Sequence, residues 1–189
     1  MNFKHIKFHI SILAIAVLLC SAFIFGNAFK DFEKSHKTSS KIADAIAPDK
    51  ENMNQAVGSM VNLGGSISAV VDGNENPEDI SVDFAIRLFA HLLEYAALGV
   101  AVMGLVLAVK MEWGKGFFGW AFFYVLAVAV ADEYIQGFSD RSSSIGDVLL
   151  DFAGALIGFA TVLSVFYTVL WIKRRKQDRL ILDEIESND

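Results

Sequence analysis

The sequence is poor in cysteine, proline and charge. The single cysteine, Cys20, cannot form an internal disulfide, so an oxidising exterior is neither required nor excluded. Two prolines and the lack of any low-complexity tract or internal repeat argue against a disordered chain. Only 20% of the residues are charged, and the formal net charge of -6 argues against a general nucleic-acid binder. No nucleic-acid partner is therefore expected.

Apolar residues, by contrast, are in excess. They make up 54% of the 189 residues, and the mean hydropathy is +0.44. Ordinary globular chains are about 45–50% apolar on a count that already includes glycine. A soluble core does not account for this surplus, so the composition predicts a small integral membrane protein.

Four long apolar runs decide the architecture, because about 20 such residues span a bilayer. The runs are Ile10–Phe25, Leu88–Val109, Phe117–Ala131 and Val148–Ile172. The third is long enough only if its helix continues through Asp132, Glu133 and Tyr134, which we expect. The sequence therefore predicts an all-α fold, an integral membrane bundle of four transmembrane helices with a long extracellular loop after the first.

Basic residues at the ends of these runs predict the orientation, since positively charged flanks stay in the cytoplasm. Lys4 and Lys7 precede the first run, Lys110 and Lys115 lie between the second and third, and the segment 173–176 follows the fourth. Both termini are therefore expected in the cytoplasm. The same 173–176 segment would also suit anionic lipid, but setting the topology is its simpler role.

The runs divide the chain into four parts, 1–26, 27–86, 87–172 and 173–189. We interpret these as a first transmembrane helix, an extracellular loop, a three-helix membrane core and a cytoplasmic tail. The first run also has the basic start and small following residues of a signal peptide, although we favour a retained span. Within the loop, Asn76 and Pro77 predict a helix start, and the mildly apolar stretch 56–71 is expected to lie on the membrane or over the helix ends.

Polar residues inside the spans are the candidates for function, because a charge at the bilayer centre costs about 2.5–3.5 kcal/mol. The alternating directions of the spans place them all at the outer level. We expect a polar cleft open to the outside, whereas a transporter would need ligands across the full depth. The cleft residues are His91 and Glu94 of the second span, with Arg87 and Tyr95 nearby, Asp132, Glu133 and Gln136 of the third, Arg141 of the outer turn, and Asp147 and Asp151 of the fourth.

The order and spacing of these residues resemble the VanZ-like family over about 88–158. That family reads Glu-x-x-Gln-x-Phe, then Arg, then Asp with Asn or Asp four residues later. The matching residues here are Glu133, Gln136, Phe138, Arg141, Asp147 and Asp151. The resemblance implies a VanZ-like core within 87–172 and a multi-pass protein of the bacterial cell membrane. The best-known member of that family is linked to low-level resistance to the lipoglycopeptide teicoplanin, so the resemblance implies this property as well. No reaction is established for the family.

Three functional interpretations remain open. In the first, Glu133, Gln136 and Arg141 bind the headgroup of a membrane lipid or lipid-linked cell-wall precursor. Arg141 would bind its phosphate or carboxylate through two hydrogen bonds. In the second, His91, Glu94 and Asp151 act as acid and base groups of a hydrolase or transferase. In the third, the same residues are interhelical polar contacts, for example Arg141 with Glu133 or Asp147, or His91 with Asp151.

Several simpler roles are expected beside these. Ser144 and Asp147 form a capping box, and Gly154 and Gly158 form a small-residue face for helix packing. Asp132 and Glu133 are adjacent, so we expect one to face the site and the other water. A single histidine among carboxylates selects no particular ion, so no metal site and no cofactor are expected.

Overall fold

The computed structural model describes residues 3–29, 41, 82–138 and 145–186. Its long helices are α1 (Phe3–Ala28), α4 (Val82–Trp113), α5 (Phe118–Gln136) and α6 (Ile145–Glu186). Each contains a stretch long and apolar enough to cross a membrane, namely Ile6–Ala28, Leu88–Trp113, Phe118–Gln136 and Ile145–Ile181. The predicted all-helical fold with four candidate spans is therefore confirmed, as is the continuation of the third helix through Tyr134.

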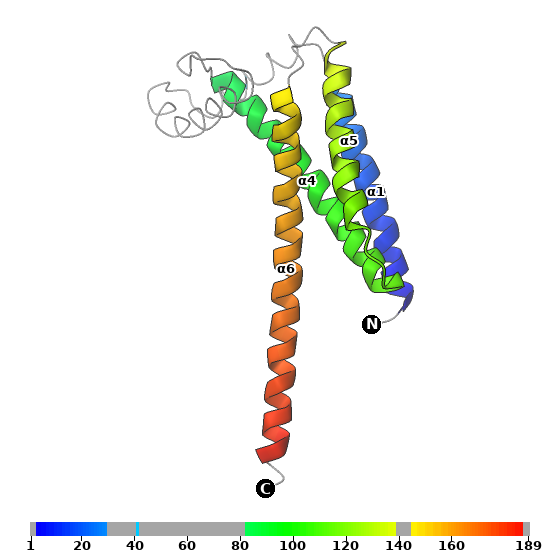
Figure 1. Ribbon diagram of the computed structural model, residues 1–189, viewed down its shortest axis with the longest axis vertical. Helices are drawn as coiled ribbons and strands as arrows, with labels where there is room; N and C mark the ends of the chain where they lie inside the picture. The colour runs from blue at the N-terminus through cyan, green and yellow to red at the C-terminus, as the bar shows by residue number, and fades with distance from the viewer. Residues whose placement is uncertain (1–2, 30–40, 42–81, 139–144, 187–189) are drawn as a thin grey trace.

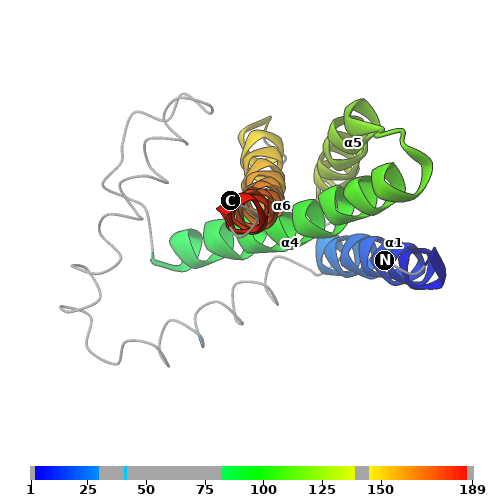
Figure 2. The same cartoon turned by 90° about the horizontal axis from the view of Figure 1, so that it is seen from below.

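Helix α4 is the central element of the bundle and contacts the other three helices. It runs obliquely, with α1 on one side and α5 and α6 on the other (Figures 1 and 2). The beginning of α4, the end of α5 and the beginning of α6 lie at one end of the molecule, which we call the cluster end. The ends of the helices that carry the basic flanks lie at the opposite end, here called the basic end.

Small residues let α4 and α6 approach closely. A Cβ atom placed on Gly154 would lie 2.7 Å from the backbone oxygen of Leu92, and one placed on Gly158 would collide with the backbone oxygen of Ala96. Gly99 of α4 faces the backbone of Ala155 in the same way. Van der Waals contact between small residues is a main source of helix association in lipid, where apolar surface gains little by leaving the lipid. The predicted packing role of Gly154 and Gly158 is confirmed.

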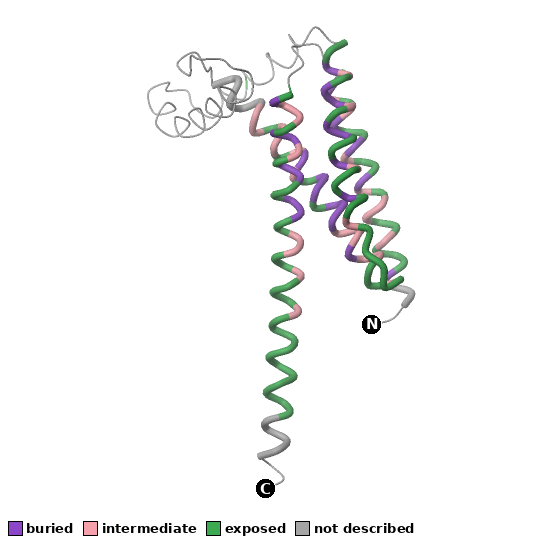
Figure 3. The backbone as a smooth tube through the Cα atoms, in the orientation of Figure 1, coloured by how far each residue is buried: buried purple, intermediate pink, exposed green. Residues whose placement is uncertain are grey.

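Burial falls off along α6. Its first half packs against α4, while most residues of its second half are exposed (Figure 3). The helix has 42 residues, which at 1.5 Å per residue is about 63 Å, roughly twice the hydrocarbon thickness of a bilayer. The sequence led us to expect the fourth span to end at Ile172, but the segment after it continues the same helix to Glu186.

Several expectations fall outside the described residues. They are the helix start at Asn76 and Pro77, the apolar stretch 56–71, Arg141 and the serine of the capping box, Ser144. The side chain of Arg87 is likewise outside the described set, although its backbone belongs to α4.

Candidate functional site

Three ligand-type side chains from three helices meet at the cluster end. His91 comes from α4, Asp132 from α5 and Asp151 from α6. One nitrogen or oxygen atom of each lies within 4.8 Å of the corresponding atoms of the other two. The position of His91 near the start of α4, Asp132 near the end of α5 and Asp151 near the start of α6 brings them to one level, because α5 runs opposite to α4 and α6. We call these three residues the His–Asp cluster.

His91 and Asp151 are close enough to form an ion pair when the imidazole is protonated. The Nδ1 atom of His91 lies 3.3 Å from Oδ1 of Asp151. The side chain of Asp151 is fully buried, whereas 22% of the His91 side chain is exposed. Neither carboxylate oxygen of Asp151 has a partner at hydrogen-bonding geometry. Asp151 therefore carries acceptor capacity that the protein leaves unused.

Asp132 is held from one side only. Its Oδ2 atom accepts hydrogen bonds from the hydroxyl of Tyr95 at 3.3 Å and from Nε2 of Gln136 at 3.0 Å. Its Oδ1 atom is buried and has no hydrogen-bond partner. The two donors fix the rotation of the carboxylate, so that one oxygen is anchored and the other is left for a further contact.

The acids at the cluster end are enclosed between helices. Asp132, Glu133 and Gln136 expose 2%, 4% and 4% of their surfaces. The expectation that either Asp132 or Glu133 faces water is therefore wrong. Both side chains lie in the interior of the bundle, where α5 contacts α1, α4 and α6. The enclosure also differs from the open cleft expected from the sequence, and His91 is the most accessible member of the cluster.

Glu94 has a different neighbour from His91. Its Oε1 atom accepts a hydrogen bond of 2.8 Å from Nδ2 of Asn27, at the end of α1. Three positions along α4 are enough to turn Glu94 toward α1 while His91 contacts Asp151 of α6. The acid and base set of His91, Glu94 and Asp151 thus contacts two different helices.

Asp147 lies at the rim of the same end. It is in the first turn of α6 and is partly exposed, one helical turn outward from the buried Asp151. An acid in the first turn is stabilised by the helix dipole. The predicted capping box also needs Ser144, which lies outside the described residues.

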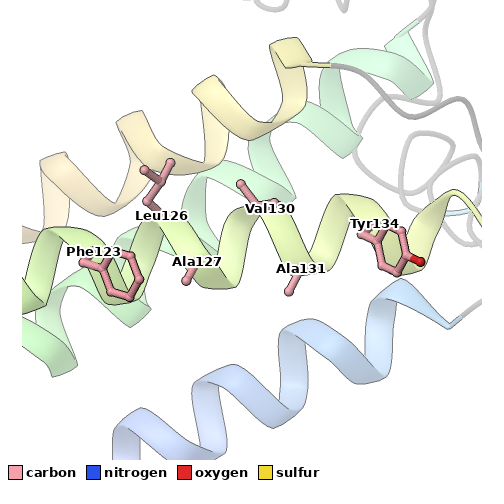
Figure 4. A pocket seen from close by; sticks show the side chains of 6 residues that line it. All are labelled: Phe123, Leu126, Ala127, Val130, Ala131 and Tyr134. Carbon is pink, nitrogen blue, oxygen red and sulfur yellow. The ribbon is translucent and has the colours of Figure 1, made fainter.

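An apolar hollow follows α5 up to this level (Figure 4). Its volume is about 460 Å³, and its walls carry almost no polar surface. The lining residues, all from α5, are Phe123, Leu126, Ala127, Val130, Ala131 and Tyr134. The hollow lies on the exposed face of α5, whereas Asp132, at the same level as Ala131 and Tyr134, is buried on the opposite face.

Comparison with known families gives one result. The sequence profile of the VanZ/LLP1 family matches residues 12–170, most of the chain. The chain belongs to the VanZ/LLP1 family. The match confirms the resemblance and extends it, because the motif residues alone covered only about 88–158 and gave no sign of relation for the first span and the loop. Neither the curated proteins nor the solved structures yield a match to this VanZ/LLP1 chain.

Two residues of this VanZ/LLP1 site were missed or undervalued. Tyr95 was expected only near the cleft, yet it is fully buried and donates to Asp132. Its spacing of four from His91, one turn along the same helix face, is a signal that places it in the cluster. Asn27 offers no such signal, because a single amide at the end of an apolar run has no pattern to join.

Proposed function

We propose that this VanZ/LLP1 protein binds the headgroup of an outer-leaflet lipid or lipid-linked cell-wall precursor in a bacterial envelope. The observation that carries the proposal is the burial of the Asp132 and Asp151 carboxylates at the cluster end with oxygens that make no hydrogen bond, in a bundle whose exposed helix faces are largely apolar. A lipid-linked ligand combines a polar headgroup with a hydrocarbon chain. The cluster suits the headgroup, and the exposed apolar surface of the spanning helices, including the hollow on α5, suits the chain.

The chemistry of the cluster favours a headgroup that donates hydrogen bonds. The unpartnered oxygens of Asp132 and Asp151 are acceptors, and they suit hydroxyl or amino groups such as those of a sugar or an amino acid. Hydrogen bonds to a charged acceptor are worth about 1.5–3 kcal/mol each, more than those between neutral groups. Arg141, in the outer turn, would add a bidentate contact to phosphate or carboxylate.

The side of the membrane follows from the basic flanks. Lys7, Lys110 and Lys115 lie at the basic end of the bundle, which the positive-inside rule assigns to the cytoplasm. The cluster end then faces the outer leaflet, where cell-wall precursors are used. Binding there would alter the interaction of a lipoglycopeptide with the cell surface. Low-level teicoplanin resistance is the expected consequence.

The test compares protection in a susceptible bacterial host. We would express Glu133→Ala, Gln136→Ala, Arg141→Ala and Asp147→Asn variants at matched membrane levels, with Tyr167→Phe, on the exposed second half of α6, as control. The wild type and the control should raise the teicoplanin concentration needed to stop growth, and the four variants should lose part or all of that increase. Wild-type protection by all four would contradict the proposal.

The close approach of His91 Nδ1 to Asp151 Oδ1 favours a second candidate, a hydrolase or transferase on an outer-leaflet lipid-linked substrate. A carboxylate beside an imidazole orients the ring and stabilises its protonated form, which is the arrangement of a general base with its supporting acid. Glu94, bonded to Asn27, would position α4 against α1. Purified protein would be incubated with bacterial lipid extracts and the products followed by mass spectrometry. Conversion equal to that of Asp151→Asn would contradict this activity.

A further inference from the structure

The His–Asp cluster has the composition of a metal site as well as its spacing. It joins one imidazole to two carboxylates, and the three ligand atoms lie within 4.8 Å of one another. Divalent ions bind such ligands at about 2.0–2.2 Å, which sets neighbouring ligand atoms about 3–4 Å apart. Small side-chain movements would therefore close the cluster around an ion. The ligands come from α4, α5 and α6, so an ion here would join three helices.

Buried carboxylate oxygens without hydrogen bonds are a second observation, independent of the spacing, that favours a cation at the cluster. Both oxygens of Asp151 and Oδ1 of Asp132 are buried without a hydrogen-bond partner, in residues that expose 0% and 2% of their surface. Asp132 is compensated at Oδ2 alone and Asp151 by one contact to His91, and burying a carboxylate costs several kcal/mol where its charge is not fully compensated. A protonated His91 would cancel one of the two carboxylate charges, whereas a divalent cation would cancel both.

Hydrogen bonds from its neighbours fix the orientation of the Asp132 carboxylate, as is usual for a carboxylate that binds a metal ion. Tyr95 and Gln136 both donate to Oδ2, so Oδ1 is the free atom, and the carboxylate cannot rotate without breaking two hydrogen bonds. Metal-binding carboxylates are usually held in this way by outer hydrogen bonds, whose loss typically weakens metal binding by about 10–100-fold.

We propose that His91, Asp132 and Asp151 bind one divalent transition-metal ion, such as Zn²⁺ or Mn²⁺. The imidazole argues against Mg²⁺ and Ca²⁺, which prefer oxygen ligands, and the lack of thiolate in the cluster argues against Cu(I). Three protein ligands leave at least one coordination position open, on the side where His91 is partly exposed. The proposal departs from the expectation of no metal drawn from the sequence, and it goes beyond the proposed function, because an ion would occupy the oxygens of Asp132 and Asp151 that a headgroup could otherwise contact.

The experiment measures metal binding by the full chain, purified in detergent and stripped with a chelator. Zn²⁺ and Mn²⁺ would be titrated by calorimetry, bound metal would be counted by mass spectrometry, and Co²⁺ would be added as a spectroscopic probe. We expect one ion per chain, visible Co²⁺ absorption bands from nitrogen and oxygen ligands, and a higher Tm in the metal-loaded protein. Absence of all three signals in the wild type would overturn the proposal without any variant.

Variants then assign the site. His91→Gln and Asp151→Asn should abolish stoichiometric binding, and Tyr95→Phe should weaken it by about 10-fold through the loss of one outer hydrogen bond. The matched control is Glu112→Gln, at the other end of α4, whose Oε2 atom is also buried without a partner but is not among the three ligands. The control should bind as the wild type does. Equal binding by the wild type and by folded Asp151→Asn would overturn the proposal, because the ion would then be held elsewhere.

Discussion

The cluster end and the basic end of this bundle differ in the side chains that lie between the helices. At the cluster end, buried acids, an amide and a tyrosine hydroxyl fill the space between helices. At the basic end, Trp113, Phe117 and Trp120 are exposed, and a hollow of about 270 Å³ between α1, α4 and α5 is lined almost wholly by apolar groups. Exposed aromatic rings beside lysines are typical of a membrane interface.

The difference between the two ends indicates which buried polar groups the fold requires. Away from the cluster end, the buried residues that the structure describes are apolar except for Ser21, which shares a 2.9 Å hydrogen bond with Tyr124. The acids at the cluster end are therefore no general requirement for a four-helix bundle of this size. Their concentration at one end is a reason to look for binding there, and the following substitutions separate what holds the bundle together from what the cluster does.

The largest effect is expected from breaking the α4–α6 contact. In Gly158→Leu the new side chain would meet the Ala96 backbone, which cannot move aside, so we expect a loss of about 3 kcal/mol or more in unfolding free energy. Gly119→Leu is the control, since a Cβ at Gly119 meets nothing within 4 Å. Thermal melting in detergent and membrane abundance would report the effect. An unchanged Tm for Gly158→Leu would mean that α4 and α6 are not this close.

A second substitution tests whether the cluster is structural. Asp151→Asn keeps the shape of the side chain and removes one of two buried carboxylate charges that share a single imidazole, so it relieves like-charge repulsion with Asp132. In chelator-treated protein we therefore expect a Tm equal to or above that of the wild type. If the cluster were only interhelical polar contact, as the third interpretation holds, Tm and abundance would fall together.

A matched pair of tyrosines compares the two ends directly. Tyr95→Phe removes the hydroxyl bonded to Asp132, and Tyr124→Phe removes the one bonded to Ser21. Each should cost about 0.5–1.5 kcal/mol of unfolding free energy, the usual net value of one hydrogen bond. Only Tyr95→Phe should also reduce protection against teicoplanin and metal affinity. Equal functional loss in both variants would mean that the effect follows stability and not position.

The smallest effect is expected on the second half of α6. Arg175 lies over the ring of Trp171 at 3.9 Å from its centroid, on an exposed surface. Arg175→Gln should leave Tm and abundance within experimental error, because cation–π contacts at exposed sites contribute little. A clear loss of stability would show that this segment packs against something else in the membrane.

The sequence predicted the helices well and their contacts less well. Hydropathy and length were enough to find four spans and to carry the third through Asp132, because lipid imposes the same requirement on every spanning helix. The common level of His91, Asp132 and Asp151 followed from alternating directions. That level is a property of the chain order, which the sequence contains.

Rotation about each helix axis was not predictable in the same way. The burial of both Asp132 and Glu133, and the turning of Glu94 toward Asn27, depend on crossing angles set by small residues such as Gly99 and Gly158. A single sequence gives the spacing of side chains on one helix but not the angle at which a second helix meets it. The partners of the acids therefore had to come from the structure.

The continuity of α6 has a mechanical consequence. From Asp151 to Glu186 the helix is unbroken, a distance of about 52 Å at 1.5 Å per residue. A tilt of about 5° pivoting at Asp151 displaces the far end by about 4–5 Å. A small rearrangement around the buried Asp151 carboxylate, on one side of the bilayer, would thus move the far end of α6 by several ångströms on the other side.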